Sequence, residues 1–363
     1  MSRLNQFLQG IKVVDLSRHL PGPLASLSMA EMGAEVVKVE PPGGEEMRFI
    51  GPPGAEGRSA YFNAVNGNKS GIQLNLKDTG DRQRFLDLIR DADVLLESFR
   101  PDVMARLDLP VALLRERNPR LIICSLNGYG SNSPLVNAVG HDLNYLAMNG
   151  VLEGTGTEAQ AVAPWPPLAD CSAGLYGLST VLAALVERSR TGKGCHIEVA
   201  LADSVMPLMA FPLADLALTG KGTPRAQSLL NGGAARYRTY QTKDGHNIAL
   251  GAVEPKFWNS FCVAAGRQEW IERISEPLPQ TALQREVAEF FSSLTLNEAN
   301  ELLAGVDCCY NDVLPLDKAI ETPHIRARQL VVEGPEGEYQ ALYPAYVDGE
   351  APLPRKGFTE AKQ

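Results

Sequence analysis

Short apolar segments alternate with segments of helical composition along the first third of the chain. Residues 11–16 and 34–40 are rich in β-branched side chains, and residues 23–32 between them have helical composition and stop at Gly33. The alternation continues with strand-like residues 71–76, 93–97 and 121–125 and with helix-like residues 79–91 and 111–117. This pattern predicts an α/β fold built on a doubly wound, Rossmann-like parallel sheet.

Such a sheet binds its ligands at the carboxyl ends of the strands, so the loops that follow the predicted strands are the first candidates for a binding site. These loops are residues 17–23, 41–51, 98–102 and 126–133, and they are rich in Gly, Pro and polar residues. We therefore expect a ligand site at this edge of the sheet.

The middle of the chain predicts one long helix followed by a strand. Residues 171–190 have the apolar spacing of a helix, with Asp170 at its N-cap, and residues 194–200 alternate like a strand. Residues 201–216 return to helical composition, which Pro207 and Pro212 must kink or end because proline cannot donate the helical hydrogen bond.

A smaller α+β domain is expected beyond this point. Residues 219–233 have the composition of a connecting loop, and residues 237–253 alternate like a hairpin around Asp244 and Gly245. The predicted division is a large domain of residues 1–217 with the C-terminal residues 325–363, and a small domain of residues 218–324.

The composition narrows the classes of function. Hydrophobic residues make up 44% and charged residues 21% of the 363 residues, as in a soluble globular protein. The net charge of -9 and the pI near 5.2 argue against nucleic acid as a partner. We recognise no apolar run long enough to span a membrane and no signal core, so no membrane partner and a cytoplasmic location are expected. The six cysteines form no CxxC pair, and no nucleotide-cofactor motif is convincing, so neither a metal nor a cofactor is expected.

Two polar segments carry candidate chemistry. His141 lies within Gly-His-Asp-Leu-Asn-Tyr at residues 140–145, and Asp170 ends Leu-Ala-Asp at residues 168–170, directly before the predicted long helix. An imidazole and a carboxyl group beside glycine-containing or helix-starting backbone suit two-base proton transfer. Each residue also has an ordinary explanation, since an aspartate before a helix is commonly an N-cap and a single histidine commonly belongs to a loop or a core.

The chain resembles the class III CoA-transferase family, and in particular its α-methylacyl-CoA racemase branch. The family's opening is similar to residues 10–42 (GIKVVDLSRHLPGPLASLSMAEMGAEVVKVEPP), and later segments are similar to residues 93–107 (DVLLESFRPDVMARL) and 191–204 (TGKGCHIEVALADS). The segments that most resemble racemases are residues 140–150 (GHDLNYLAMNG) and 251–257 (GAVEPKF). Sibling transferases commonly lack the histidine, so His141 favours the racemase branch.

The resemblance implies a role for each candidate residue. His141 would act as the base on one face of the substrate carbon and Asp170 as the acid on the other, with the roles exchanged for the opposite enantiomer. Glu254 would orient the imidazole. A backbone amide near Asp142, or the exposed amides at the start of the helix predicted from residue 171, would stabilise the enolate oxygen. Tyr145 would support His141. The substrate would be an acyl-CoA thioester that needs no further cofactor.

A CoA thioester carries phosphates, so the large domain is expected to supply cations and backbone donors. By resemblance, the residues expected to bind CoA are Arg18, Leu20, Pro21, Lys69, Arg100 and Arg106. For each arginine the alternative is an ordinary surface charge.

Two other functions remain open. A CoA-transferase would use Asp170 as a nucleophile, would pass through a mixed anhydride, and would not need His141. A CoA-thioester binder without activity would keep the fold alone. The resemblance also implies an interlocked homodimer, in which His141 and Asp170 come from one chain and Glu254 from its partner.

Overall fold

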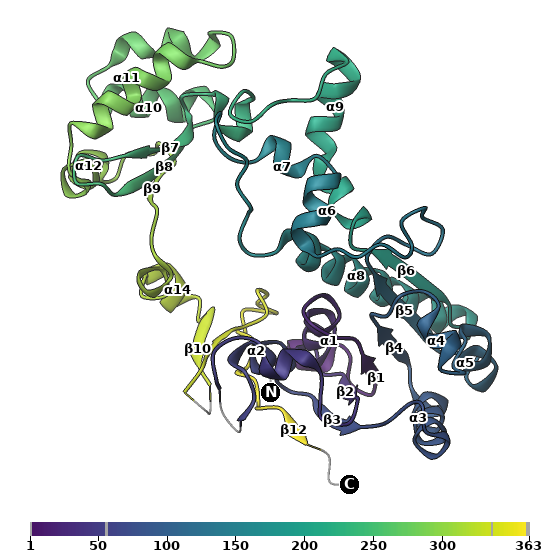
Figure 1. The fold of residues 1–363 in the computed structure, drawn as a ribbon. Helices are drawn as coiled ribbons and strands as arrows, with labels where there is room; N and C mark the ends of the chain where they lie inside the picture. The colour runs from purple at the N-terminus through teal and green to yellow at the C-terminus, as the bar shows by residue number, and fades with distance from the viewer. Residues whose placement is uncertain (1, 55–56, 335–336, 361–363) are drawn as a thin grey trace. The chain divides into compact units, whose positions relative to one another are not determined.

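The computed structural model describes residues 2–54, 57–334 and 337–360, and it divides the chain into two compact units (Figure 1). The first unit contains Met1–Met148, Trp165–Leu208 and Ile320–Gln363, and the second contains Asn149–Pro164 and Met209–Ala319. The sequence predicted residues 149–164 in the large domain, but in the structure they belong to the second unit.

Seven parallel strands form the sheet of the first unit, in the order β12-β3-β2-β1-β4-β5-β6. The strands are β1 (Lys12–Leu16), β2 (Glu35–Glu40), β3 (Ser70–Gln73), β4 (Val94–Glu97), β5 (Ile122–Asn127), β6 (His196–Ala200) and β12 (Thr359–Glu360). This confirms the predicted doubly wound α/β fold. The strand order reverses between β1 and β4, and such a switch point opens a ligand crevice at the carboxyl ends of the strands.

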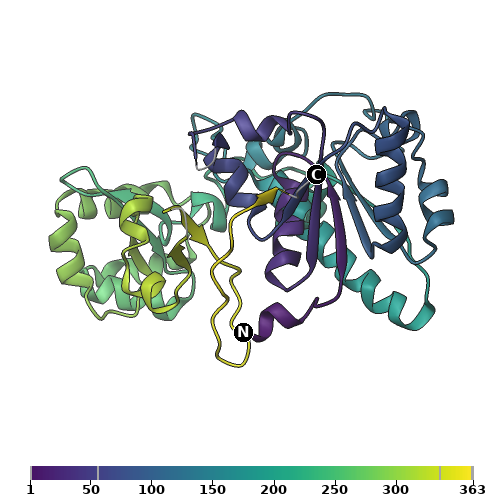
Figure 2. The ribbon, with the colours of Figure 1, turned by 90° about the horizontal axis from the view of Figure 1, so that it is seen from below.

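Helices cover both faces of this sheet (Figures 1 and 2). Successive side chains of a strand point to opposite faces, so Val13 packs in the core beneath α1 and α8, whereas Val14 packs in the core beneath α3 and α5. The helices of the first unit are α1 (Pro21–Glu31), α2 (Ala60–Asn66), α3 (Thr79–Asp91), α4 (Val103–Arg106), α5 (Val111–Arg117), α6 (Asp142–Met148), α8 (Leu168–Thr191) and α14 (Pro323–Ala327).

Helix α8 packs closely against α1 because both helices have small residues at the contact. A side-chain carbon at Gly174 would lie 2.6 Å from the carbonyl oxygen of Pro21, so only glycine fits there. The helix ends at Gly192, whose φ of 72° is in the left-handed region and agrees with the break predicted from the sequence.

By length and composition, α8 is also the one helix in the described part of the chain that could cross a membrane. The sequence had led us to expect no such segment. Ala173, Leu178 and Val181 of α8 pack into the core of the first unit, so these apolar side chains already have protein partners.

The second unit is a small α+β structure. Its antiparallel sheet has the order β7-β8-β9, and β7 and β8 form a hairpin around Asp244 and Gly245, where the alternation predicted one. Tilted and stacked aromatic rings of Trp258, Phe261 and Phe291 fill its core. The elements are α7 (Val151–Gly154), α9 (Ala210–Thr219), β7 (Tyr237–Gln241), β8 (Asn247–Gly251), α10 (Pro255–Ala264), α11 (Thr281–Ser292), α12 (Leu296–Leu303), β9 (Tyr310–Asp312) and α13 (Leu316–Ala319).

The remaining elements are short. The helical stretch expected at residues 201–216 is divided, as Pro207 required, into a 3-10 segment, η4 (Asp203–Met209), and helix α9. The other short elements are η1 (Arg3–Gln6), η2 (Glu46–Phe49), η5 (Leu229–Gly233), η6 (Gln268–Trp270), η7 (Glu272–Ser275), β10 (Val331–Glu333) and β11 (Tyr339–Ala341). Strand β12 returns the end of the chain to the sheet edge beside β3.

Candidate active site

A cavity of about 1050 Å³ lies in the first unit at the carboxyl ends of β1, β4 and β5. Arg18, Ser98 and Gly128, each of which closely follows one of these strands, contribute to its wall. The described residues that line it all belong to the first unit. The cavity therefore lies at the switch point of the sheet, where the loops after the predicted strands were expected to bind a ligand.

His141 and Asp170 both line this cavity. His141 directly precedes α6, and its amide donates a hydrogen bond to Oδ1 of Asn144 at 3.0 Å, which fixes the turn that carries the imidazole. Asp170 lies in the first turn of α8 and is partly buried. The two residues that the sequence singled out are thus brought to one space from separate elements.

The carboxylate of Asp142 joins these two elements. Its Oδ1 accepts hydrogen bonds from the amides of Ala169, at 2.6 Å, and of Asp170, at 3.1 Å. Free amides at a helix start need acceptors, and a carboxylate there also interacts favourably with the helix dipole.

The prediction that Asp170 is the N-cap of the long helix is wrong. The helix begins at Leu168 after Pro167, so Asp170 is its third residue, and the capping carboxylate comes from Asp142 on another segment. The Asp170 side chain is therefore not needed to cap its own helix and is left facing the cavity.

The surroundings of Asp170 change its protonation. Burial, reinforced by the negative charge of Asp142, raises the pKa of Asp170 to about 6, although the nearby His141 opposes this rise. A carboxyl group of this pKa has substantial populations of both protonated and ionised forms near neutral pH. It is able to donate a proton in one form and accept one in the other.

Tyr145 supports the turn before His141. Its hydroxyl donates a hydrogen bond to the carbonyl oxygen of Gly140 at 2.8 Å, and its ring packs edge-on against Tyr129. Burial raises the pKa of Tyr145 to about 12, so the hydroxyl remains protonated. The supporting role of Tyr145 for His141 stays a prediction.

Four of the residues expected to bind CoA line the cavity: Arg18, Leu20, Pro21 and Arg100. The guanidinium carbon of Arg18 lies 5.1 Å from the ring centre of Phe99, a cation–π arrangement that holds the side chain at the wall. Two arginines in the wall of the cavity suit the phosphate groups of a nucleotide.

The other two residues lie elsewhere. Lys69 is buried, and its ammonium donates to Asp15 and Asn66 and to the carbonyl oxygen of Pro23. Arg106 is exposed on α4 and is paired with Asp102 at 3.2 Å. Neither residue lines the cavity, because Lys69 points into the protein core and Arg106 toward solvent. We therefore do not retain them as CoA contacts.

Glu254 lies in the second unit, at the N-cap position of α10, where its own side chain caps no amide. Its backbone carbonyl accepts the amide of Trp258 at 3.2 Å. The local structure thus leaves the carboxylate available for another partner, and the role predicted for Glu254 stays a prediction.

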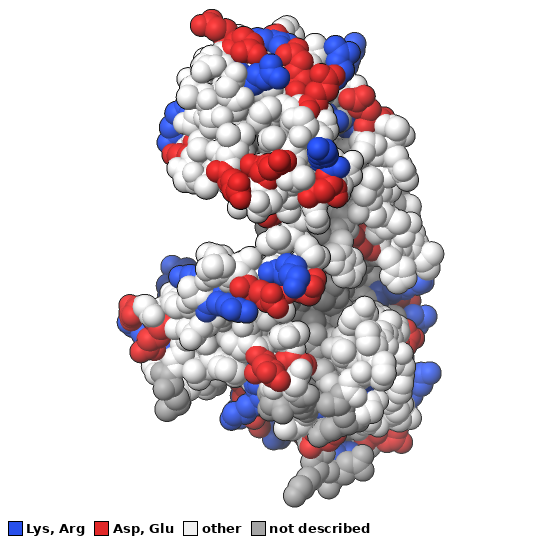
Figure 3. All heavy atoms as spheres, turned by 90° about the vertical axis from the view of Figure 1, so that its left-hand side faces the viewer, with Lys and Arg blue, Asp and Glu red and all other residues white. Residues whose placement is uncertain are grey.

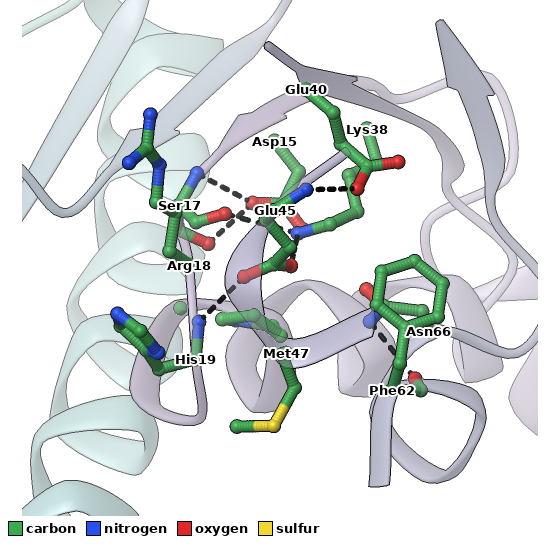
Figure 4. Close-up of polar contacts among 12 residues, drawn as sticks. Asp15, Ser17, Arg18, His19, Lys38, Glu40, Glu45, Met47, Phe62 and Asn66 are labelled. Atoms are coloured by element: carbon green, nitrogen blue, oxygen red, sulfur yellow. Dashed lines mark hydrogen bonds and ion pairs between the residues drawn. The ribbon is translucent and has the colours of Figure 1, made fainter. Parts of the chain in front are cut away.

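A buried ionic network supports the loop that carries Arg18, and the sequence reading missed it (Figure 4). Asp15 accepts the amide of Ser17, and the ammonium of Lys38 lies 2.7 Å from Glu45 and donates to the carbonyl oxygen of Ser17 at 3.0 Å. Charged residues inside apolar strands, such as Asp15 in β1 and Lys38 in β2, are the sequence signal that could have revealed this network.

Acidic and basic side chains are interspersed on the face of the molecule drawn in Figure 3. On this face neither sign forms a continuous surface, so charge there does not indicate a large polyanionic partner. The binding features described above are local to the cavity.

The cavity at the switch point is lined by two arginines, an imidazole and a carboxyl group of raised pKa. Such a site suits an α/β protein that binds an anionic ligand and transfers protons. The model of CoA-transferase family III matches residues 8–353, and the chain belongs to this family. Members of the family are enzymes, and both racemases and CoA-transferases occur among the relatives of this chain.

Human alpha-methylacyl-CoA racemase is 33% identical over 331 residues, which cover 88% of this chain and 81% of the racemase. Human succinyl-CoA:glutarate CoA-transferase is 32% identical over 267 residues, which cover 73% of this chain and 60% of the transferase. Among solved structures, Rv3272 from Mycobacterium tuberculosis is 30% identical, with a TM-score of 0.82 and coverage of 97% and 96% of the two chains. These similarities establish the family and leave both activities as candidates.

Proposed function

We propose that this protein is a 2-methylacyl-CoA racemase that inverts the carbon next to the thioester. The observation that carries the proposal is that His141 and Asp170, an imidazole and a carboxyl group of raised pKa, line one cavity. Inversion requires a proton to leave one face of the carbon and another to arrive at the opposite face, hence two acid/base groups.

The proposed reaction proceeds through an enolate. In one direction, neutral His141 takes the α-proton, the electrons of the carbon–hydrogen bond move into the thioester carbonyl, and protonated Asp170 then gives its proton to the other face. In the reverse direction, ionised Asp170 is the base and the imidazolium of His141 is the acid. A backbone amide near Asp142 would stabilise the enolate oxygen.

We assign the orientation of His141 to Glu254. A carboxylate that accepts the second ring N–H of a histidine fixes its tautomer and stabilises the imidazolium. The Glu254 side chain at the start of α10, which caps no amide of its own helix, supports this assignment. As the resemblance implies, it would come from the partner chain of the dimer.

The test is incubation of the purified protein with a single enantiomer of a 2-methylacyl-CoA in deuterated water. Racemisation predicts deuterium at the α-carbon and loss of optical purity without any added acid, because the returned proton comes from an exchangeable group. No exchange and no transfer, with CoA binding intact, would leave a binding protein and contradict the proposal.

A CoA-transferase is the second candidate, favoured by relatives of comparable identity and by the exposure of Asp170 to the cavity. Asp170 would attack the thioester carbonyl, form a mixed anhydride and release CoA thiolate. This reaction depends on an acceptor carboxylate and does not need His141. Dependence of CoA exchange on added succinate or oxalate would therefore identify it.

We also propose a homodimer. Helix α9 has no buried residue although it is largely apolar, and Phe211 and Leu218 are 74% and 87% exposed. An apolar face of this kind usually contacts another protein surface. Light scattering coupled to size-exclusion chromatography should give twice the chain mass of 39.3 kDa.

We further propose that the protein acts in the cytoplasm and needs neither a metal nor a cofactor. All six cysteines are free thiols in the structure, which suits a reducing compartment. Proton transfer between His141, the substrate and Asp170 requires only acid/base groups.

A further inference from the structure

Two wall segments of the cavity, distant in the sequence, are connected by one buried carboxylate. Arg18 and Leu20 follow β1, whereas Met47 and Ile50 belong to or follow η2, and all four line the cavity. Glu45, which directly precedes η2 and is 2% exposed, reaches across to the first segment (Figure 4). Its Oε2 accepts the amide of His19 at 2.9 Å.

The other carboxylate oxygen of Glu45 lies 2.7 Å from the ammonium of Lys38, which is fully buried. The same ammonium donates to the carbonyl oxygen of Ser17 at 3.0 Å. Lys38 and Glu45 together therefore hold the carbonyl of Ser17 and the amide of His19, the peptide groups on either side of Arg18.

The turn between these two peptide groups requires external support. His19 has a φ of 62°, in the left-handed region that side chains other than glycine rarely adopt. A conformation of this kind persists when the surrounding contacts determine it. The amide of Arg18 adds one more contact, a hydrogen bond to Oγ of Ser98 at 2.8 Å, so each peptide group of the turn is held.

Neither Lys38 nor Glu45 lines the cavity, and the proposed proton transfer uses neither of them. A buried ion pair of this kind contributes little net stability, because desolvation of the two charges offsets their attraction. Its geometric effect is larger, since it fixes the direction in which Arg18 enters the cavity. Glu45 also joins this turn to the segment that carries Met47.

We propose that Glu45 is a positioning residue for CoA-thioester binding, which acts through Lys38 and the His19 amide to set the 17–19 turn and the Arg18 side chain. The inference rests on the proposed CoA ligand, but it holds for a racemase and for a transferase alike. It predicts an effect on binding rather than on the chemical step.

The test compares Glu45→Gln with Glu46→Gln in the full-length protein. Glutamine at position 45 keeps an acceptor for the His19 amide but removes the charge that holds Lys38, whereas Glu46 is an exposed neighbour outside the cavity wall. Titration calorimetry with CoA should show at least a roughly tenfold higher Kd for Glu45→Gln and less than a twofold change for Glu46→Gln. The kcat at saturating acyl-CoA should stay within about threefold, so the loss appears in KM.

The calorimetric stoichiometry separates positioning from unfolding. A purely structural defect would lower the number of binding sites per chain while the Kd of the folded fraction stayed unchanged, and that result would overturn the inference. If Glu45→Gln does not fold, the double variant Lys38→Met, Glu45→Gln removes both buried charges together and should fold while binding CoA at least about tenfold more weakly. Wild-type affinity in that variant would also overturn it.

The wild-type protein distinguishes this inference from the proposed function. Failure of the wild-type chain to bind CoA would contradict the proposed function itself. CoA binding by the wild type together with an unchanged Kd in Glu45→Gln would contradict only the role of Glu45.

Discussion

Two groups of charged residues lie close to the same cavity and differ in what surrounds them. Beneath the wall, Asp15 is buried, but the ammonium groups of Lys38 and Lys69 outweigh the effect of burial and hold the pKa of Asp15 well below its usual range. At the wall, burial and a neighbouring carboxylate, Asp142, raise the pKa of Asp170 to about 6. A buried carboxyl group with positive charges around it stays ionised near neutral pH, whereas a buried carboxyl group beside another carboxylate titrates there.

The difference separates two tasks. Asp15, whose charge is compensated by the two ammonium groups, accepts the backbone amide of Ser17 and stays ionised near neutral pH. The uncompensated group is suited to proton transfer, because a small change in its surroundings alters its protonation. Substitutions at either group should therefore have different consequences.

The largest effect is expected at the titratable group. Asp170→Asn and His141→Ala should each reduce α-proton exchange at least about a thousandfold in one direction, because each removes one of the two proton-transfer groups. Deuterium incorporation from each enantiomer measures the loss. His246→Ala, at an exposed histidine of the second unit, is the control and should retain normal exchange. Unchanged exchange in His141→Ala would remove the imidazole from the mechanism.

Substitution of a residue in the network around Asp15 should change the stability of the fold. Lys69→Met leaves Asp15 without one of its two buried counter-charges and should lower the free energy of unfolding by about 3 kcal/mol. Denaturant titration measures it, with exposed Lys77→Met as the control. Exchange per folded molecule should persist, because Lys69 does not line the cavity. Equal stability of the two variants would contradict the assigned role.

The stability that Asp15 contributes should depend on pH. Since the folded-state pKa of Asp15 lies below its unfolded value of 3.8, its ionised form stabilises the fold above that pH, and this contribution is lost as the pH falls through the folded value. The difference in stability between the wild type and Asp15→Asn should therefore shrink as the pH falls below 3.8 toward the folded-state value. A difference that grew on acidification would contradict the compensated state of Asp15.

A smaller effect tests the like charge itself. Asp142→Asn keeps an oxygen to cap α8 but removes the negative charge, so the pKa of Asp170 should fall toward its ordinary value, by about one unit. The charged or titratable groups facing Asp170 are Asp142, His141, Tyr145 and Cys171. In the direction in which Asp170 donates a proton, the decline of kcat/KM above pH 6 should therefore begin at lower pH. An unshifted profile would show that burial alone sets the pKa.

The smallest effect concerns the cations at the cavity. Arg100→Ala removes a cavity arginine and should raise the Kd for CoA about tenfold, with the difference narrowing at high salt. Arg106→Ala removes an arginine that the structure places on the surface and should change the Kd less than twofold. Equal effects of the two substitutions would contradict the location of the CoA phosphates at this cavity.

The sequence predicted the sheet correctly, because β-branched runs such as residues 11–16 and 34–40 have few alternatives to a buried strand. It also selected His141 and Asp170, whose shared cavity follows from the strand order. It misplaced Lys69, because the composition of a loop does not tell whether a lysine points outward or inward toward Asp15. It missed the cap by Asp142, since that contact spans 27 residues and depends on how two helices meet.

The bridge between Asp142 and α8 constrains how the enzyme can vary. Asp142 is the neighbour of His141 in the chain and hydrogen-bonds to the amide of Asp170 itself, so a shift of α8 carries both side chains along. In the proposed mechanism, the separation between the proton donor and the proton acceptor would thereby be insulated from changes elsewhere in the wall. Residues that would surround the acyl group could then diverge toward other substrates without altering the distance over which the proton would move.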